Sequence, residues 1–260
     1  MEYLNESTSK GNQPKFIEGD WFYKEDSMGY ESIAEALVSE FLSYVEGIEF
    51  IDYYLDVIEY DGKRMECCKS KIYTTDGKSF VPVRKILNYY ADKKELSKKT
   101  GKALLDYVVD CVYKATNLDI RDYLRTLTYI DSIILNEDRH FNNICLVEDR
   151  DGNYRVAPIF DNGLSLLSDT SQDYRYGVSL DILIRNVKCM PFVNSFSKQV
   201  SYFENRPLVI DIDGFLNKLD MVDADLDSYI PFKQEGYERA KKVLLKRLKE
   251  TEGTLWVRKM

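Results

Sequence analysis

Residues 136–143 read NEDRHFNN and residues 160–163 read FDNG, which places Asp161 eighteen positions after Asn143. An Asp, an Asn five residues later and a following Asp-x-Gly occur in the order that Mg²⁺-nucleotide phosphotransferases use. In that chemistry one carboxylate accepts the proton of the attacking hydroxyl, while an amide and a second carboxylate hold the metal that bridges the phosphates. The two segments together therefore predict a phosphoryl-transfer site.

Within these segments, Asp138 is the candidate general base, because a placed carboxylate can orient and deprotonate a hydroxyl. Asn143 and Asp161 are the candidate metal ligands, since amide and carboxylate oxygens suit Mg²⁺. Taken singly, each is more often a turn or helix-end residue. We expect His140, the only histidine, to brace the loop rather than to act as the base. Whether Arg139 contacts phosphate or an acidic side chain is left open.

The first ninety residues are rich in strand patterns and contain one helix. Residues 16–24 are typical of a hairpin, and residues 31–44 carry apolar side chains at helical spacing. Two further strand-like runs, 50–60 and 63–69, flank the Asp61-Gly62 pair, a strong hairpin signal. These patterns predict a small β-rich lobe.

Helical patterns dominate from about Ser97 onward. Two apolar stripes at helical spacing predict a pair of long helices; they consist of Leu104, Leu105, Val108, Val109, Val112 and Tyr113, and of Leu124, Leu127, Ile130, Ile134 and Leu135. Asn136 is the expected end of the second helix. A short hairpin, 144–147 with 154–157, then leads to Asp161, and the chain beyond Ser179 is mainly helical.

These elements predict an α+β fold with the two-lobed architecture of protein kinases. Residues 1–90 form the predicted N-lobe, with the phosphate loop, the lysine strand, one helix and a β-hairpin. Residues 91–260 form the helical C-lobe, with the catalytic and metal loops at the join. A chain of 260 residues suffices for two closely packed lobes with real cores.

A phosphotransferase also needs a cation on the nucleotide phosphates, held by a carboxylate. Lys24 ends the strand-like run WFYK, and strand alternation points it into the cleft. Glu31 and Glu35, one helical turn apart on the next helix, are both candidate partners. The sequence does not choose between them, and exposed lysine and glutamate side chains are the default alternative.

Composition narrows the class of protein. The formal net charge of -8 argues against direct nucleic-acid binding. A local lysine run is best explained as a solvated helix face; it comprises Lys93, Lys94, Lys98, Lys99 and Lys102. No apolar stretch approaches the ~20 residues of a membrane span, and the N-terminus lacks signal-peptide features.

The five cysteines show no C-x-x-C spacing, and with a single histidine a zinc site is improbable. Reduced and mostly buried thiols in a cytoplasm fit best; the residues are Cys67, Cys68, Cys111, Cys145 and Cys189.

Four stretches resemble the HipA-like serine/threonine kinases of bacterial toxin–antitoxin modules. Residues 9–15, SKGNQPK, resemble the S-x-G-x-Q-P-K phosphate loop of that family, and residues 21–24, WFYK, resemble its lysine strand. Residues 136–143 resemble its N-x-D-x-H-x-x-N motif, and residues 157–161, APIFD, resemble its [AT]-P-x-[YF]-D motif. The matches run through the first two-thirds of the chain.

The resemblance implies a kinase fold, ATP with Mg²⁺, and transfer to a serine or threonine hydroxyl of a protein substrate. It implies Asp138 as base, Asn143 and Asp161 as metal ligands, and Lys24 on the phosphates. A small antitoxin-like partner protein is also implied, since the additional N-terminal subdomain common in the family is expected to be absent here or supplied separately.

The phosphate loop carries further expectations. Its backbone N–H groups can approach phosphate, and the resemblance places Gly11 and Gln13 at the nucleotide. Because family members can autophosphorylate a serine of this loop, Ser7 and Ser9 are the candidate positions. A flexible terminus is the simpler interpretation of the same residues.

Two alternatives remain open from the sequence. Phosphoinositide kinases share a D-R-x-x-x-N loop and a later D-x-G, so a phosphoinositide or small-molecule kinase is possible, although the acidic net charge disfavours a membrane-facing enzyme. A kinase-like scaffold without catalysis is the second alternative. Every base and metal position is filled, which favours an active enzyme.

Overall fold

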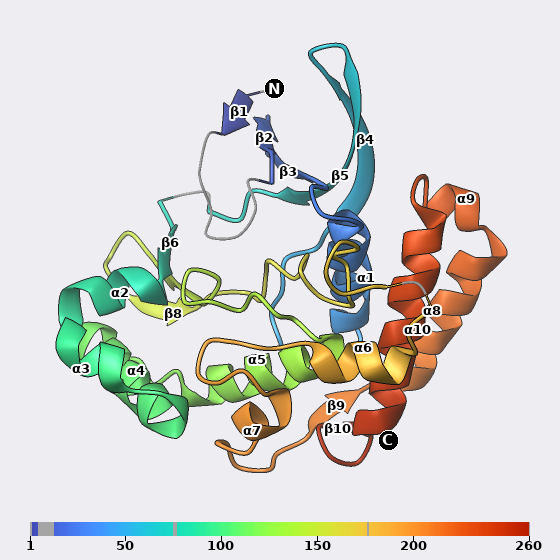
Figure 1. The fold of residues 1–260 in the computed structure, drawn as a ribbon. Helices are drawn as coiled ribbons and strands as arrows, with labels where there is room; N and C mark the ends of the chain where they lie inside the picture. The colour runs from blue at the N-terminus through green and yellow to red at the C-terminus, as the bar shows by residue number, and fades with distance from the viewer. Residues whose placement is uncertain (1, 5–12, 75–76, 176, 260) are drawn as a thin grey trace.

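A five-stranded antiparallel sheet forms one end of the molecule (Figure 1). The structure is a computed structural model and describes residues 2–4, 13–74, 77–175 and 177–259. The strands, in the order β1-β2-β3-β5-β4, are β1 (Glu2–Leu4), β2 (Lys15–Glu18), β3 (Trp21–Glu25), β5 (Lys63–Lys71) and β4 (Tyr54–Tyr60). Both hairpins predicted for this sheet are confirmed, and Asp61 and Gly62 adopt the left-handed conformation that a tight hairpin turn requires.

Strand register decides which side chains face the rest of the protein. Lys15 is paired with Lys24, and Lys24 with Cys68, so the three lie in one row on the same face of the sheet. The predicted helix α1 (Glu31–Leu42) follows β3 after a short turn and is almost entirely buried. Lys24 is consequently buried beside this helix, as strand alternation predicted.

The remainder of the molecule is mainly helical (Figure 1). Its helices are α2 (Val83–Tyr90), α3 (Lys93–Lys98), α4 (Gly101–Thr116), α5 (Arg121–Ile134), α6 (Leu180–Asn186), α7 (Phe196–Val200), α8 (Ile212–Ala224), α9 (Leu226–Tyr229) and α10 (Gln234–Thr251). The two predicted apolar stripes lie on α4 and α5 and are largely buried in the core. Helix α5 ends at Ile134, earlier than expected, because Leu135 adopts a left-handed conformation.

Two smaller sheets complete the fold. The predicted hairpin of β7 (Cys145–Glu148) and β8 (Tyr154–Val156) is confirmed, and β6 (Ser79–Pro82) adds a third strand to it. A parallel pair, β9 (Leu208–Ile210) with β10 (Trp256–Arg258), was not predicted. The division near residue 90 stays a prediction. Both β6 and α2 precede it, yet β6 pairs with β7 and α2 packs against α4.

Helix α10 packs against α1, so the C-terminal helix reaches the helix that follows the lysine strand (Figure 1). The two helices approach closely at Gly236, where an added Cβ atom would lie 2.8 Å from Cβ of Tyr30. The contact ties the small sheet end to the helical end.

Three further expectations can be compared with the structure. All five cysteines are buried with free thiols, as predicted. The lysine run lies on α3 and the start of α4, where its members are mostly exposed and several pair with Glu95 or Asp106. Within the described part of the chain, no helix is both long and apolar enough to cross a membrane.

Candidate active site

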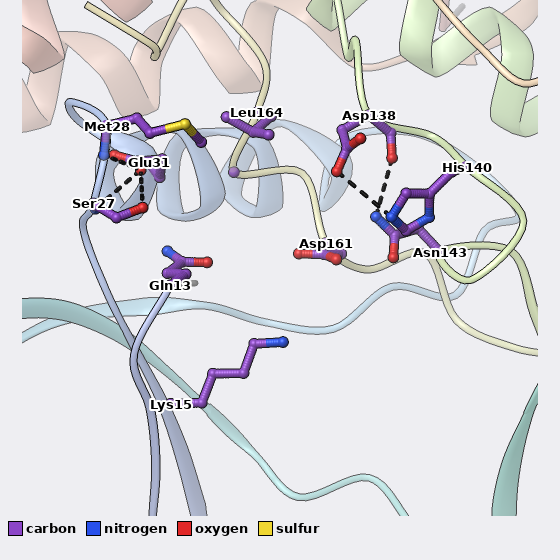
Figure 2. Close-up of a pocket in the computed structure, with 11 residues that line it drawn as sticks. Gln13, Lys15, Ser27, Met28, Glu31, Asp138, His140, Asn143, Asp161 and Leu164 are labelled. Atoms are coloured by element: carbon purple, nitrogen blue, oxygen red, sulfur yellow. Dashed lines mark hydrogen bonds and ion pairs between the residues drawn. The ribbon is translucent and has the colours of Figure 1, made fainter. Parts of the chain in front are cut away.

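The predicted site residues meet at a cleft between the sheet and the helical part (Figure 2). Its walls come from residues 13–15, the turn before α1 (residues 26–30), the loop after α5 (residues 135–144) and the segment that contains Asp161 (residues 160–170), called the metal-loop segment here after its predicted role. The lining residues are Gln13, Lys15, Ser27, Met28, Glu31, Asp138, His140, Asn143, Asp161, Gly163 and Leu164.

Lys24 lies buried beside this cleft and joins two acids. Its Nζ is 2.6 Å from Oε1 of Glu35 and 2.6 Å from Oδ1 of Asp161. The ring of Tyr53 lies 5.0 Å from the same ammonium and covers it on another side. Burial alone would lower the pKa of Lys24, but Asp161 and Glu35 outweigh it and hold the pKa well above its ordinary value. Lys24 is therefore a permanent cation.

The sequence left open whether Glu31 or Glu35 pairs with Lys24, and in the structure the partner is Glu35. Its Oε1 accepts from Lys24, and its Oε2 accepts the N–H of Asn162 at 2.8 Å. Glu31 lines the cleft, but its carboxylate accepts the backbone N–H groups of residues 27–29 at 2.6–3.0 Å. The oxygens of Glu31 hold the turn in front of α1, so Glu31 is not the partner of Lys24. Its role at the cofactor stays a prediction.

Asp161 occupies an unusual backbone position, with φ at 58° in the left-handed region. Burial would raise the pKa of its carboxyl group, but the charge and hydrogen bond of Lys24, helped by Lys15 and Arg139, lower the pKa to about 2. The side chain keeps 32% of its surface exposed. Asp161 is therefore an ionised carboxylate that still faces the cleft.

The loop after α5 is folded by its own hydrogen bonds. The N–H of His140 donates to the Asp138 carbonyl at 2.7 Å, and the N–H of Asn143 donates to the His140 carbonyl at 2.8 Å. The Asn143 side chain donates from Nδ2 to the Asp138 carbonyl at 3.0 Å. These bonds bring the side chains of Asp138 and Asn143 to one side of the cleft (Figure 2).

His140 contributes to this loop mainly through its backbone. Its imidazole Nε2 lies 3.7 Å from Oδ2 of Asp138, which exceeds a normal hydrogen-bond length. The imidazole borders the cleft, and the bracing role of His140 stays a prediction.

Arg139 turns inward and connects the two motifs. It is 1% exposed and binds both carboxylate oxygens of Asp131 on α5 at 3.0–3.2 Å. It also donates to the carbonyl oxygens of Asn143 and Phe160 and to Oδ1 of Asn162. Of the two contacts left open by the sequence, the structure shows the acidic side chain.

Some predicted site residues lie outside the described part of the chain, and some site residues were not predicted. Ser7, Ser9 and Gly11 belong to the part that the structure does not describe, whereas Gln13 lines the cleft. Lys15 and Tyr53 were not named as site residues. Pairing of the two strands would have indicated Lys15, since it stands opposite Lys24. No local signal indicated Tyr53, which meets Lys24 only through folding.

Asp131 was also missed, although a signal existed. It stands within the apolar stripe of α5, next to Ile130 and four residues after Leu127, and is 1% exposed. A charged residue on a buried helix face needs a partner of opposite charge.

No family model matches this chain, and no curated protein matches it. Among solved structures it is similar to the Helicobacter pylori proinflammatory kinase CtkA, with a TM-score of 0.59. The alignment covers 95% of this chain and 92% of that chain at 14% identity. At this identity the likeness concerns the fold alone. The chain has a two-lobed kinase-like fold, as the sequence predicted, and the narrower HipA-like resemblance rests on its four motifs.

Proposed function

We propose that this chain is an ATP- and Mg²⁺-dependent protein serine/threonine kinase of HipA-like type. The observation that carries the proposal is the buried contact of Lys24 with both Glu35 and Asp161, beside a cleft that also contains Asp138 and Asn143. A lysine held by a helix carboxylate and placed against a metal-binding aspartate is the arrangement that protein kinases use for phosphoryl transfer.

In the proposed reaction, a serine or threonine hydroxyl of a protein attacks the γ-phosphorus of ATP. Asp138 accepts the hydroxyl proton, a new O–P bond forms, and the bond between the γ-phosphorus and the bridging oxygen breaks to release ADP. Lys24 neutralises negative charge on the phosphates, which its raised pKa supports, because it remains protonated at every physiological pH. Lys15, on the neighbouring strand and facing the same cleft, is placed to add a second positive charge.

Asn143 and Asp161 are the residues that would hold Mg²⁺. Because Nδ2 of Asn143 is engaged with the Asp138 carbonyl, its Oδ1 is the end of the amide left for a metal. Among the described residues no three His, Cys, Asp or Glu side chains form a cage, which suits Mg²⁺, since it usually takes one or two protein oxygens together with substrate phosphates. When bound, the ion would offset the negative charge of the phosphates.

The test is transfer from γ-labelled ATP by the purified chain, compared with Asp138→Asn and Asp110→Asn. Asp138→Asn keeps the shape of the side chain and removes the base, so we expect turnover to fall about 10³-fold. Asp110, exposed on α4, is the matched control and should behave as the wild type. Turnover in Asp138→Asn equal to the control would contradict the assigned base.

The acceptor class needs its own measurement. The chain is incubated with labelled ATP and either a cell lysate or phosphoinositide-containing vesicles. Label in protein phosphoserine or phosphothreonine, including sites in the chain itself, is the expected outcome. Label found only in lipid would replace the protein kinase with a phosphoinositide kinase.

A further inference from the structure

The turn between β3 and α1, residues 26–30, is held by a lysine from the far end of the chain. Nζ of Lys233 donates to Oδ2 of Asp26 and, at 2.7 Å, to the carbonyl oxygen of Gly29. Asp26 in turn accepts the N–H of Ser32 in the first turn of α1 with its other oxygen, Oδ1. Lys233, which stands immediately before α10, therefore contacts the segment that sets where α1 begins.

The same turn is also fastened to the segment that follows Asp161. The N–H of Tyr30 donates to the Ser168 carbonyl at 3.2 Å, and the N–H of Thr170 donates to the Met28 carbonyl at 3.2 Å. A side chain at Gly29 would clash with the Ser168 carbonyl oxygen. The turn is thus bound on one side by the metal-loop segment and on the other by Lys233.

Packing strengthens this arrangement. Tyr30 is buried between Gly236 of α10 and the metal-loop segment, where its hydroxyl donates to the Leu166 carbonyl at 2.9 Å. Glu35 follows Tyr30 by little more than one helical turn and faces Lys24. We expect a shift of the turn to displace Glu35, because both are joined by the hydrogen-bonded first turns of α1.

The cation is needed because Asp26 is poorly solvated. Burial raises the pKa of Asp26, and Lys233 is the main group that opposes this rise. Lys233 is about one-third exposed, whereas the Asp26 side chain is 3% exposed. Removing Lys233 leaves a buried carboxylate without its cation, which favours opening of the turn.

We propose that Lys233 is a positioning residue for phosphoryl transfer. From the start of the C-terminal helix it holds residues 26–30, and through them it keeps Glu35 in contact with Lys24. The inference rests on the proposed function. Through the residue that precedes it, α10 would then support the nucleotide site, although α10 itself does not line the cleft.

The experiment compares Lys233→Met with Lys241→Met in the full-length chain. Lys241 is the matched control because it lies on α10 and also binds two carboxylates, Asp223 and Glu238, away from the cleft. We expect kcat for ATP turnover to fall about tenfold or more in Lys233→Met, since small displacements at an active site cost this much. Lys241→Met should stay within twofold of the wild type, and Lys233→Arg should restore most of the loss.

A second substitution separates positioning from general stability. If Lys233 acts through Glu35, then in a Glu35→Gln background Lys233→Met lowers kcat by less than twofold, while it still lowers the melting temperature. A further tenfold loss in that background would overturn the inference. Equal kcat for Lys233→Met and Lys241→Met would overturn it as well.

Hydrogen exchange gives a readout that does not depend on catalysis. The backbone N–H groups of residues 27–29 are protected by Glu31, and we expect them to exchange faster in Lys233→Met than in Lys241→Met. Unchanged exchange would overturn the inference even for an active enzyme. If the wild type is inactive but residues 27–29 exchange faster in Lys233→Met, the proposed function is refuted. The contact of Lys233 with the turn is then still supported.

Discussion

Two buried clusters lie next to each other in this molecule, and each contains one cation and at least one acidic side chain. They differ in whether the charged groups are fully enclosed by protein or partly exposed to the cleft. Around Arg139, all five N–H donors of the guanidinium are used, on Asp131, Asn162 and two backbone carbonyls. Around Lys24, the ammonium binds Glu35 and Asp161, and Asp161 keeps about a third of its surface open to the cleft.

This difference indicates that the Arg139 cluster has a structural role, whereas the Lys24 cluster can still contact a ligand. A planar guanidinium with every donor engaged fixes the backbone of the two loops and has nothing left for a ligand. An ammonium is a compact charge that can redistribute its contacts. Under the proposed function, phosphates would compete for Lys24 and a metal would compete for Asp161. We therefore expect substitutions in the Lys24 cluster to affect turnover first, and substitutions in the Arg139 cluster to affect stability first.

The largest expected effect is that of Lys24→Met. Turnover of ATP should fall about 10³-fold or more, because the phosphates lose a desolvated cation. The loss of stability should be smaller than for Arg139→Met, because one of the two acids that Lys24 binds, Asp161, keeps 32% of its side chain exposed to solvent, whereas the side chain of Asp131 is 1% exposed. Steady-state kinetics and urea unfolding of the same preparation measure both quantities. If Lys24→Met lost stability but kept its turnover, the expected difference between the Lys24 and Arg139 clusters would be wrong.

Arg139→Met should destabilise the protein by about 3 kcal/mol, as expected when one partner of a buried ion pair is removed. The cause is the buried Asp131, which would be left without its cation. The free energy of unfolding in urea provides the measurement. The control is Arg155→Met, because Arg155 forms a largely exposed pair with Glu49 and should change stability by less than ~1 kcal/mol. Equal losses of unfolding free energy in Arg139→Met and Arg155→Met would contradict a structural role for Arg139.

The smallest expected effect is a dependence of stability on pH. The pKa of Asp161 is about 2 in the folded chain, against about 3.9 in an unfolded one. A lowered folded-state pKa adds stability that is fully present above about pH 4 and is lost as the pH falls towards 2. The unfolding free energy of the wild type minus that of Asp161→Asn should therefore be flat from pH 5 to 8 and shrink between pH 4 and 2. A difference that does not change with pH would show that Asp161 is not paired.

Local patterns predicted those parts of the fold that depend on neighbours in sequence. The hairpin at Asp61-Gly62 and the helix over residues 31–44 were found because turn chemistry and apolar spacing act over a few residues. The parallel pair of β9 and β10 was not found, since its strands lie almost fifty residues apart and pair only when the helical part closes. A parallel pair leaves no turn signal.

The same division holds for the candidate site. Asp138, Asn143 and Asp161 were found by order and spacing, because the loops that carry them are short and folded by local bonds. The choice of Glu35 over Glu31 was beyond local reasoning. Both residues lie on one side of α1, and only the position of the sheet and of Asn162 decides which carboxylate meets Lys24.

By itself, the sequence determined the α+β fold and the order and spacing of the candidate base, metal-ligand and cation residues. Residue type, spacing and short-range hydrogen bonding suffice for that. The tertiary structure alone decided that Glu35 holds Lys24, that Arg139 is enclosed with Asp131, and that Lys233 reaches Asp26 across 207 positions. Contacts between distant segments depend on how helices and sheet pack, and packing is a property of the whole chain.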